Sequence, residues 1–549
     1  MRAIRPTLAL LMLPCIGPMA FADSAATVVH DPGQALPTDA ELERAGARIG
    51  RISIENDAIF DENDPREDAV LYRAVNRLHV TTRESTIRAQ LLFASGDRYS
   101  RRVLDESERA LRSQRYLREP AIQPVAWHDG VVDLRVRSED VWTTNPGLSL
   151  SRTGGTNTLG FELEELNLFG RGKQLSAGYS NNVDRTSIGL SWRDPAVWGS
   201  RWTSGASFTD SDDGSGWSLA AERPFYELDA RWSAGFAAQS LTQVENRYAL
   251  GQRVDGWRAD RQAFDIHRGW SSGLRDDWVR RWTAGFRHDR ARFGPADTAL
   301  VGPLPADRTL AYPYARLELL QDDYSTAHNL DQIGRTEDLS FGTQLAAEIG
   351  WSQSAFGASR DALVASLDAR RGYRLPADQT LFAAASWASR LESGRLRDSL
   401  LSASVRYFWR VNERTVFYAG LAADSGSALD LDHELTLGGD TGLRGYPLRY
   451  QTGTARALLT LEGRYFTDWY PFRLARVGAA IFADVGRSWG ASALDVPELG
   501  TLRDVGIGLR FGNTRSALGN VLHVDLAFPL DGDPSIKSVQ FLLKTHKSF

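Results

Sequence analysis

Cysteine is almost missing from this chain of 549 residues, and its one cysteine, Cys15, lies close to the start. Two arginines precede an apolar run over 8–20, and the Ala-Phe-Ala at 20–22 matches the small-residue pattern of a leader cleavage site. We therefore predict a signal peptide over 1–22. The chain that remains would have no cysteine, which excludes disulfides, a thiol nucleophile and a cysteine-ligated metal.

Long apolar runs and a strong net charge are also missing. After the predicted leader, no run approaches the roughly 18 apolar residues that a membrane-spanning helix needs. The formal net charge is -5, so the chain lacks the basic excess by which proteins attract nucleic acid. We predict that nucleic acid is not a partner.

Sequence patterns of metal sites are absent as well. The 9 histidines form no His-x-x-x-His or His-Glu-x-x-His pair. The acidic stretch over 210–216 lacks the glutamate of a calcium loop and is most simply a solvated surface loop. We predict that the protein is not an enzyme and that it carries no metal and no cofactor.

Glycine and aromatic residues, by contrast, are abundant, with 49 Gly, 16 Trp, 16 Tyr and 23 Phe. This composition favours a large β structure. From Gly147 onward, runs of about ten residues alternate apolar with small or polar residues, as at 173–181, 340–350 and 414–423. Such alternation is typical of transmembrane β-strands, although a soluble β-sandwich would also show it. We predict a mainly β fold with an antiparallel barrel over 147–549 and an even strand number of roughly 16 to 20.

The preceding segment, 48–140, has the pattern of a small α+β domain. Its predicted elements are, in order, a strand at 49–54, a helix from a capping box at 81–84 to Gly96, a helix that Ser100 begins, and strands at 122–127 and 131–137. An Asp-Gly turn joins the last two strands, which is a strong hairpin signal. Residues 23–47 are polar and contain prolines, and we predict a flexible arm there.

A glycine-rich stretch late in the barrel region carries a single cation. Residues 438–447 read Gly-Gly-Asp-Thr-Gly-Leu-Arg-Gly-Tyr-Pro, with Arg444 near the middle. So many glycines indicate a backbone with unusual dihedrals or one pressed against another surface. Further along, Asp484 lies in a strand-like run beside a glycine. The stretch is either a tight hairpin with a solvated arginine or a loop held against the wall by an ion pair between Arg444 and Asp484.

These two motifs, in this order, resemble those of the BamA/TamA/FhaC superfamily of outer-membrane assembly and secretion barrels, the bacterial surface antigen family. The resemblance rests on Gly438, Gly439, Gly442, Leu443, Arg444, Gly445 and Tyr446 in the loop and on Phe482, Asp484 and Gly486 in the strand. The element order of 48–140 is similar to that of a POTRA domain, the periplasmic module of such barrels. The last run, with Phe541 and the terminal Phe549, resembles the C-terminal signal that is read when barrels are assembled.

The resemblance implies a location, a mechanism and partners. The barrel would lie in the bacterial outer membrane with its single POTRA-like module in the periplasm, and it would assemble or export polypeptide clients. In the family the loop folds into the lumen and its arginine pairs with the strand aspartate, here Arg444 with Asp484. The first and last strands, near 147–153 and 536–545, would meet at a weak seam.

The implied partners are outer-membrane lipid, polypeptide clients, and a periplasmic partner that adds a strand to the module. The alternative is a passive outer-membrane channel or uptake pore that keeps the same architecture.

Overall fold

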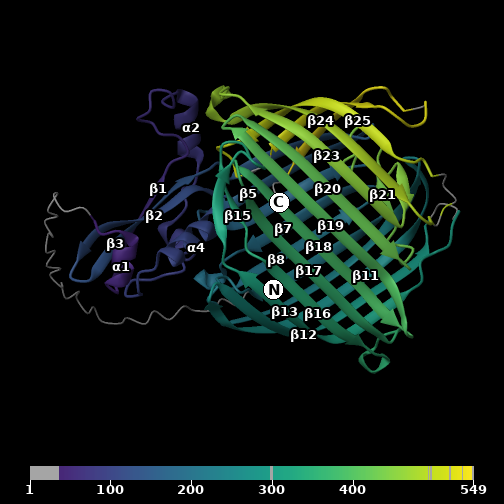
Figure 1. The fold of residues 1–549 in the computed structure, drawn as a ribbon, viewed down its shortest axis with the longest axis horizontal. Coiled ribbons are helices and arrows are strands. Elements are labelled where there is room, and N and C mark those ends of the chain that lie inside the picture. The colour runs from purple at the N-terminus through teal and green to yellow at the C-terminus, as the bar shows by residue number, and fades with distance from the viewer. Residues whose placement is uncertain are drawn as a thin grey trace, which may run out of the picture.

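The computed structural model describes residues 36–296, 301–492, 494, 498–517, 521–534 and 536–546. An N-terminal α+β domain lies against one end of a large barrel (Figure 1). We call this the domain end of the barrel and the opposite one the far end. The predicted signal peptide over 1–22 falls outside the described residues.

The N-terminal domain consists of a three-stranded sheet and four helices. Its elements are α1 (Asp39–Arg44), β1 (Arg48–Asp57), α2 (Val70–Leu78), α3 (Glu84–Arg88), α4 (Arg101–Arg112), β2 (Leu117–His128) and β3 (Val131–Asp140). The strand order is β1-β3-β2, with β3 parallel to β1 and antiparallel to β2. Alternation along β3 buries Val132, Leu134 and Val136 in the core that also holds Leu104 and Leu111 of α4.

Three features of this domain differ from the sequence-based expectation. The flexible arm predicted for 23–47 is wrong from Thr38 onward, because a capping box starts α1 there and Leu42 is buried in the core. The helix predicted between Thr81 and Gly96 is shorter than expected, since α3 ends at Arg88. Leu91 is buried in the core from the irregular segment that follows. Helix α2 was not predicted, and it contributes no buried residue to the core.

The barrel is a single antiparallel sheet of 20 strands, at the upper end of the predicted range. Its strands are β4 (Thr144–Thr153), β5 (Thr156–Leu168), β6 (Lys173–Asn181), β7 (Thr186–Asp194), β8 (Thr203–Ser211), β9 (Gly214–Arg223), β10 (Trp232–Ala249), β11 (Gln252–Arg275), β12 (Trp278–Pro295), β13 (Arg308–Gln321), β16 (Gln344–Ser352), β17 (Ala362–Leu375), β18 (Gln379–Glu392), β19 (Arg395–Asn412), β20 (Thr415–Ser427), β23 (Ala455–Phe466), β24 (Ala475–Trp489), β25 (Leu502–Asn513), β26 (Val521–Pro529) and β27 (Gln540–His546). Short helical turns lie at Val197–Gly199, Ser354–Phe356 and Pro471–Arg473. The mainly β fold predicted from the sequence is confirmed.

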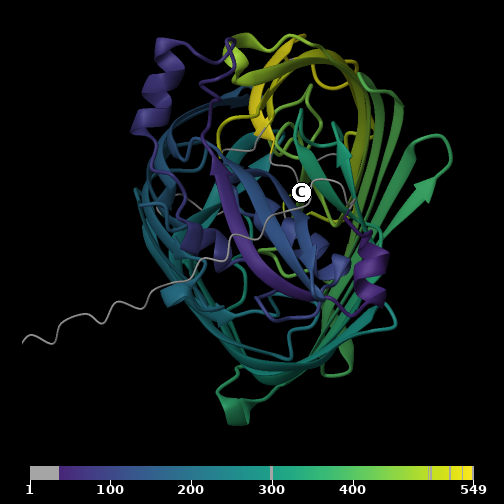
Figure 2. The same cartoon turned by 90° about the vertical axis from the view of Figure 1, so that its left-hand side faces the viewer.

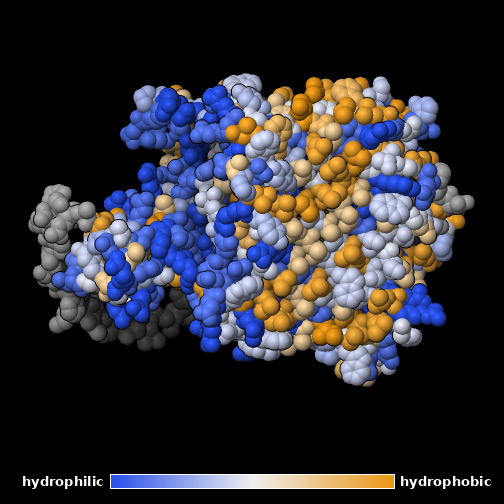
Figure 3. Space-filling view, in the orientation of Figure 1, coloured by the Kyte–Doolittle hydropathy of each residue, from blue (hydrophilic) through white to orange (hydrophobic). Residues whose placement is uncertain are grey.

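The wall of the barrel alternates as the sequence predicts. In β25, Val505 and Ile507 are exposed on the outside, whereas Asp504 and Arg510 are buried on the inside. Figure 3 shows hydrophobic residues gathered over the barrel wall and hydrophilic residues over the N-terminal domain. None of the described helices is both long and apolar enough to cross a membrane.

The joint between the first and last strands is weak. Among the described residues, β27 pairs with β4 only at Leu543 and Arg152. By contrast, β26 and β27 pair without a break from Val521 with His546 to Ala527 with Gln540. We call the joint between β4 and β27 the seam.

A hairpin between β13 and β16 enters the barrel from the domain end. Its strands are β14 (Tyr324–His328) and β15 (Thr336–Ser340), and we call it the domain-end hairpin. Leu330 and Ile333 at its tip pack against Phe408 and other apolar side chains that face into the barrel. Arg112 of α4 donates to both carboxylate oxygens of Asp338, at 2.9 and 2.8 Å, so the hairpin is also fixed to the N-terminal domain. Figure 2 looks onto this end and shows the domain in front of the barrel mouth.

Candidate functional site

The chain between β20 and β23 folds into the barrel from the far end. Two short strands, β21 (Leu435–Leu437) and β22 (Gln451–Gly453), pair at its base, and the segment 438–447 forms its tip. We call this tip the lumen loop. Leu443 and Tyr446 are buried with Leu437, Tyr450 and Leu502, so the loop is packed against the wall and not solvated.

Arg444 is the centre of the contact between the lumen loop and the wall. Its Nε donates to Asp484 Oδ2 at 2.7 Å and its Nη2 to Asp484 Oδ1 at 3.0 Å. Its Nη1 donates to Glu462 Oε2 at 3.1 Å. The guanidinium carbon lies 3.4 Å from the centre of the Phe482 ring, a cation–π contact. The structure therefore brings Arg444, Phe482 and Asp484 together in the geometry for which a guanidinium fork is suited.

Asp484 is fully buried and belongs to a group of carboxylates on four neighbouring strands. It lies directly across from Asp504 in the register of β24 and β25. Glu462 on β23 and Asp525 on β26 complete the group, and Arg510 donates to both of them. Arg444 is thus the cation that neutralises the Asp484 side of the group, while Gly445 N donates to Asp504 at 2.9 Å.

The glycines of the two motifs allow this close packing. A Cβ on Gly445 would lie 2.6 Å from Asp504 Cβ, and one on Gly486 would lie 2.3 Å from Leu443 Cδ1. Gly442 has a φ of +115°, which strains any other residue. The predicted Gly438 and Gly439 face backbone atoms of the returning chain, where a Cβ would come within 2.4 and 2.6 Å of the carbonyl oxygens of Pro447 and Tyr446.

Tyr446 fastens the end of the lumen loop to the far end of the wall. Its hydroxyl donates to Arg503 O at 2.7 Å and accepts from Arg503 N at 3.2 Å. A buried hydroxyl normally requires such partners, because an unpaired one would cost roughly 1–3 kcal/mol.

The lumen loop also touches both sides of the seam. Lys544 of β27 donates through Nζ to Asp440 O at 3.4 Å. Gly154, in the turn between β4 and β5, packs so closely that a Cβ there would lie 2.7 Å from the carbonyl carbon of Pro447. Asp184 lies in the turn between β6 and β7, and it accepts from Arg449, just beyond the loop, at 3.0 and 2.7 Å. The loop therefore spans the strands on either side of the weak joint.

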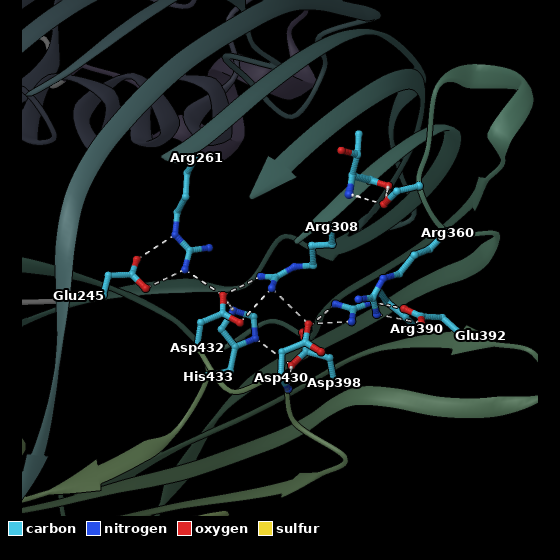
Figure 4. Close-up of polar contacts among 12 residues, drawn as sticks. Glu245, Arg261, Arg308, Arg360, Arg390, Glu392, Asp398, Asp430, Asp432 and His433 are labelled. Atoms are coloured by element: carbon cyan, nitrogen blue, oxygen red, sulfur yellow. Dashed lines mark hydrogen bonds and ion pairs between the residues drawn. The ribbon is translucent and has the colours of Figure 1, made fainter. Parts of the chain in front are cut away.

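A second charged network holds the chain that leads into the lumen loop (Figure 4). Asp432 accepts from Arg308 at 2.9 and 2.8 Å and from Arg261 at 2.8 Å. Asp430 accepts from Arg390 at 2.8 Å. Sequence reasoning missed this network because its partners lie on β11, β13 and β18, far from the loop in the chain, and no local pattern connects them.

Part of this network has the donor set of a cation site. Asp398, Asp430 and His433 place three ligand atoms near one another. Arg390, however, donates to both Asp398 and Asp430, and His433 Nδ1 lies 2.8 Å from Asp398 Oδ1. These side chains satisfy one another, so the cluster is a set of ion pairs.

The predicted C-terminal signal is described only in part. Phe541 lies on β27, is exposed on the outside of the barrel and pairs with Leu526 of β26. Phe549 falls outside the described residues.

Two stretches match the Gly-x-Ser-x-Gly pattern of a nucleophile elbow, around Ser271 and Ser488. An elbow requires a sharp turn from a strand into a helix. Both serines lie inside barrel strands and donate to backbone carbonyls, Ser271 to Arg280 O at 2.8 Å and Ser488 to Ala455 O at 3.0 Å. Neither is set up as a nucleophile.

A barrel with an apolar exterior, a folded-in loop and an N-terminal α+β domain defines a class of outer-membrane β-barrel proteins. Residues 167–544, more than half of the chain, match the Omp85 superfamily domain. The chain therefore belongs to the Omp85 superfamily, which confirms the resemblance to BamA/TamA/FhaC-type barrels. It is an outer-membrane barrel of the polypeptide translocase or insertase type.

Several solved structures are similar to the chain. CdiB from Acinetobacter baumannii is 13% identical with a TM-score of 0.44, over 91% of this chain and 74% of that one. CdiB from Escherichia coli is 15% identical with a TM-score of 0.44, over 90% and 76%. BamA from Haemophilus ducreyi lacking POTRA domains 1–3 is 13% identical with a TM-score of 0.38, over 90% and 84%. Among curated proteins, no sequence matches this chain.

Proposed function

We propose that this barrel assembles or exports polypeptide clients by opening its seam, and that the lumen loop controls how the seam opens. The observation that carries the proposal is the seam itself, which has one residue pair in the described part of β4 and β27 and is spanned by a loop anchored through Arg444. A strand edge that separates easily can pair with an incoming client strand. Arg444 and Asp484 would keep the loop in place while β4 and β27 part.

The N-terminal domain would act as a POTRA-like module in the periplasm and receive the client first. Its sheet has β1 and β2 as edges. Pro120 and Pro124 interrupt β2, and proline blunts an edge because it has no N–H to donate. Residues 96–99 already bond to the start of β1. A client strand would therefore add to the second half of β1, from Ser53 to Asp57.

The alternative, a passive channel, has less support. Free diffusion of solutes needs an open lumen, whereas the lumen loop and the domain-end hairpin both occupy the interior of this barrel. Neither insert is needed by a pore that conducts at all times.

Covalent trapping tests the proposed function. A photo-crosslinking residue at Arg152 in β4, and another at Glu55 in β1, are expected to capture outer-membrane or exported polypeptides in cells. The same residue at Ile266 of β11 serves as a control, because it is exposed on the lipid side far from the seam. Equal capture at all three positions, or no polypeptide at Arg152, would contradict the proposal.

The C-terminus should determine how much barrel reaches the membrane. We expect deletion of Phe549 to lower the amount of folded barrel severalfold, and the change Phe541→Ser to add to this loss. Aromatic residues at the ends of lipid-facing strands anchor barrels at the membrane interface. The measurement is the amount of folded barrel in outer-membrane fractions, seen on a gel as the band whose migration changes on heating. Normal levels of that band after both changes would remove this interpretation of the C-terminus.

A further inference from the structure

Helix α2 turns its apolar side away from the protein. At about 100° per residue, its apolar residues fall on one side. Ala74 and Val75 on that side are half-buried, and the other aliphatic residues of the helix are exposed. Val70 is 76% exposed, Leu71 60% and Leu78 75%, and Val80 just after the helix is 53% exposed. A helix of a globular domain normally does the opposite and buries this side.

The inward side of α2 is instead polar and well anchored. The ring of Tyr72 stacks on that of Phe60 with centroids 4.4 Å apart. Asn76 Nδ2 donates to Phe60 O at 2.9 Å, and Phe60 N donates to Asn76 Oδ1 at 3.2 Å. The outward direction of the apolar side is therefore fixed by specific contacts.

The same segment is fixed to the rim of the barrel. Glu67 accepts from Arg473 Nε and from Arg515 Nη2, both at 2.8 Å. These arginines lie in the turns that follow β23 and β25 at the domain end. Tyr72 Oη also donates to Phe472 O at 3.1 Å. Figure 2 shows α2 beside the rim, outside the ring of strands and away from the barrel mouth.

The turn to which α2 is bonded lies at the end of the lipid-facing wall of the barrel. The turn after β23 exposes Phe472 and Trp469, and β24 next to it exposes Ile481 on the outside. Exposed aromatic residues at the end of such a wall mark the boundary between membrane and water. The turn that carries them is the one to which α2 is bonded, so the helix lies at the height of this boundary.

We propose that α2 is an interfacial helix that lies in the surface of the membrane leaflet at the domain end, with Val70, Leu71 and Leu78 among the lipids. Helices of this kind bury their apolar side roughly 5–10 Å into the region where headgroups meet acyl chains. The helix thereby fixes the N-terminal domain beside the membrane, near strands β24 to β27 that lead to the seam.

Apolar contact, not charge, is the basis of this binding. Asp64 accepts from Arg66 at 2.9 Å, and Asp68 pairs with Arg73. The charges near the helix are thus largely paired with one another. A membrane of zwitterionic phosphatidylcholine should suffice, and salt should not release the helix because screening acts on charges alone.

Site-specific fluorescence in lipid tests the proposal. Leu71→Cys and Leu78→Cys are each made in a Cys15→Ser background and labelled with a polarity-sensitive dye. The full chain is then placed in phosphatidylcholine nanodiscs, one chain to a disc, which excludes a second copy and any client. Glu62→Cys is the matched control, because Glu62 is exposed on the polar side and accepts from Asn76. Heat-modifiable migration confirms that each barrel is folded.

We expect the dyes at positions 71 and 78 to emit at a shorter wavelength than the dye at position 62. They should also lose about half of their emission when lipids with a shallow quencher are added, as for a helix at the interface. The control should change little, and high salt should alter none of the three. Labels at positions 71 and 78 that behave like the control in single-chain discs would overturn the proposal. So would protection that occurs only when two chains share a disc, since a second copy would then cover the helix.

Discussion

Replacing Arg444 by alanine is expected to leave a folded barrel in the membrane and to abolish most client assembly. The change removes two N–H donors from Asp484, which is fully buried beside Asp504. Breaking a buried ion pair by removing one partner costs about 3–5 kcal/mol, and water in the lumen would reduce this value. The loop should then detach, which protease cleavage within 438–447 and loss of client crosslinks from Arg152 would report.

A double-mutant comparison identifies the pair as the cause. Arg444→Ala and Asp484→Asn should each impair assembly, and the double variant should be little worse than either, because all three lose one interaction. Arg444→Lys should rescue only partly, since an ammonium cannot form the two parallel bonds of a guanidinium. Arg503→Ala is the matched control, because Arg503 pairs with Asp531 at the surface of the same region. Defects that simply add would contradict the pairing.

Locking the seam is expected to abolish function reversibly. Arg152 and Leu543 are direct register partners, and Cα atoms of such partners lie about 4.5–5.5 Å apart, within reach of a disulfide. In Arg152→Cys/Leu543→Cys, oxidation should therefore stop client crosslinking, and a reductant should restore it. The measurement is the yield of trapped client before and after reduction.

The control for this lock uses the same first cysteine. Arg152 also pairs with Asn157 across the turn between β4 and β5. A disulfide in Arg152→Cys/Asn157→Cys joins two strands that stay together when the seam opens, so activity should persist. If the seam-locked barrel keeps full activity, lateral opening is not needed, and the passive-channel alternative takes its place.

Much of this architecture can be predicted from the sequence because it depends on patterns within short stretches of the chain. The alternation of apolar and polar residues along a strand does not depend on which neighbouring strand it pairs with. Arg444 and Asp484 stand in short motifs of their own, so their pairing could be expected before the structure. The bounds of the long strands β10 to β12 do not follow from the sequence, because these strands run well beyond the length that crosses a membrane.

The partners of the site depend on register and could not be read in the same way. Asp504 and Asp525 join the Arg444 site only because β24 to β26 align them with Asp484 on one inner surface. The domain-end hairpin gives no signal, because its strands are short and resemble the barrel strands around them. The exposure of helix α2 could not be predicted either, because an apolar side at helical spacing normally indicates a buried side.

The two inserts inside the barrel are linked through two side chains of β23, Arg464 and Glu462. Arg464 of β23 donates to Leu330 O at the tip of the domain-end hairpin, and its Nε donates to Glu462 Oε1 at 3.0 Å. Glu462 in turn binds Arg444 of the lumen loop. Because Arg112 of α4 holds the same hairpin, a chain of contacts runs from the domain through the whole interior.

Displacing either insert should therefore weaken the hold on the other, and the coupling free energy is the same in both directions. At rest the barrel should be electrically silent in a planar bilayer, and current should begin only when a load on the N-terminal domain has loosened both inserts together.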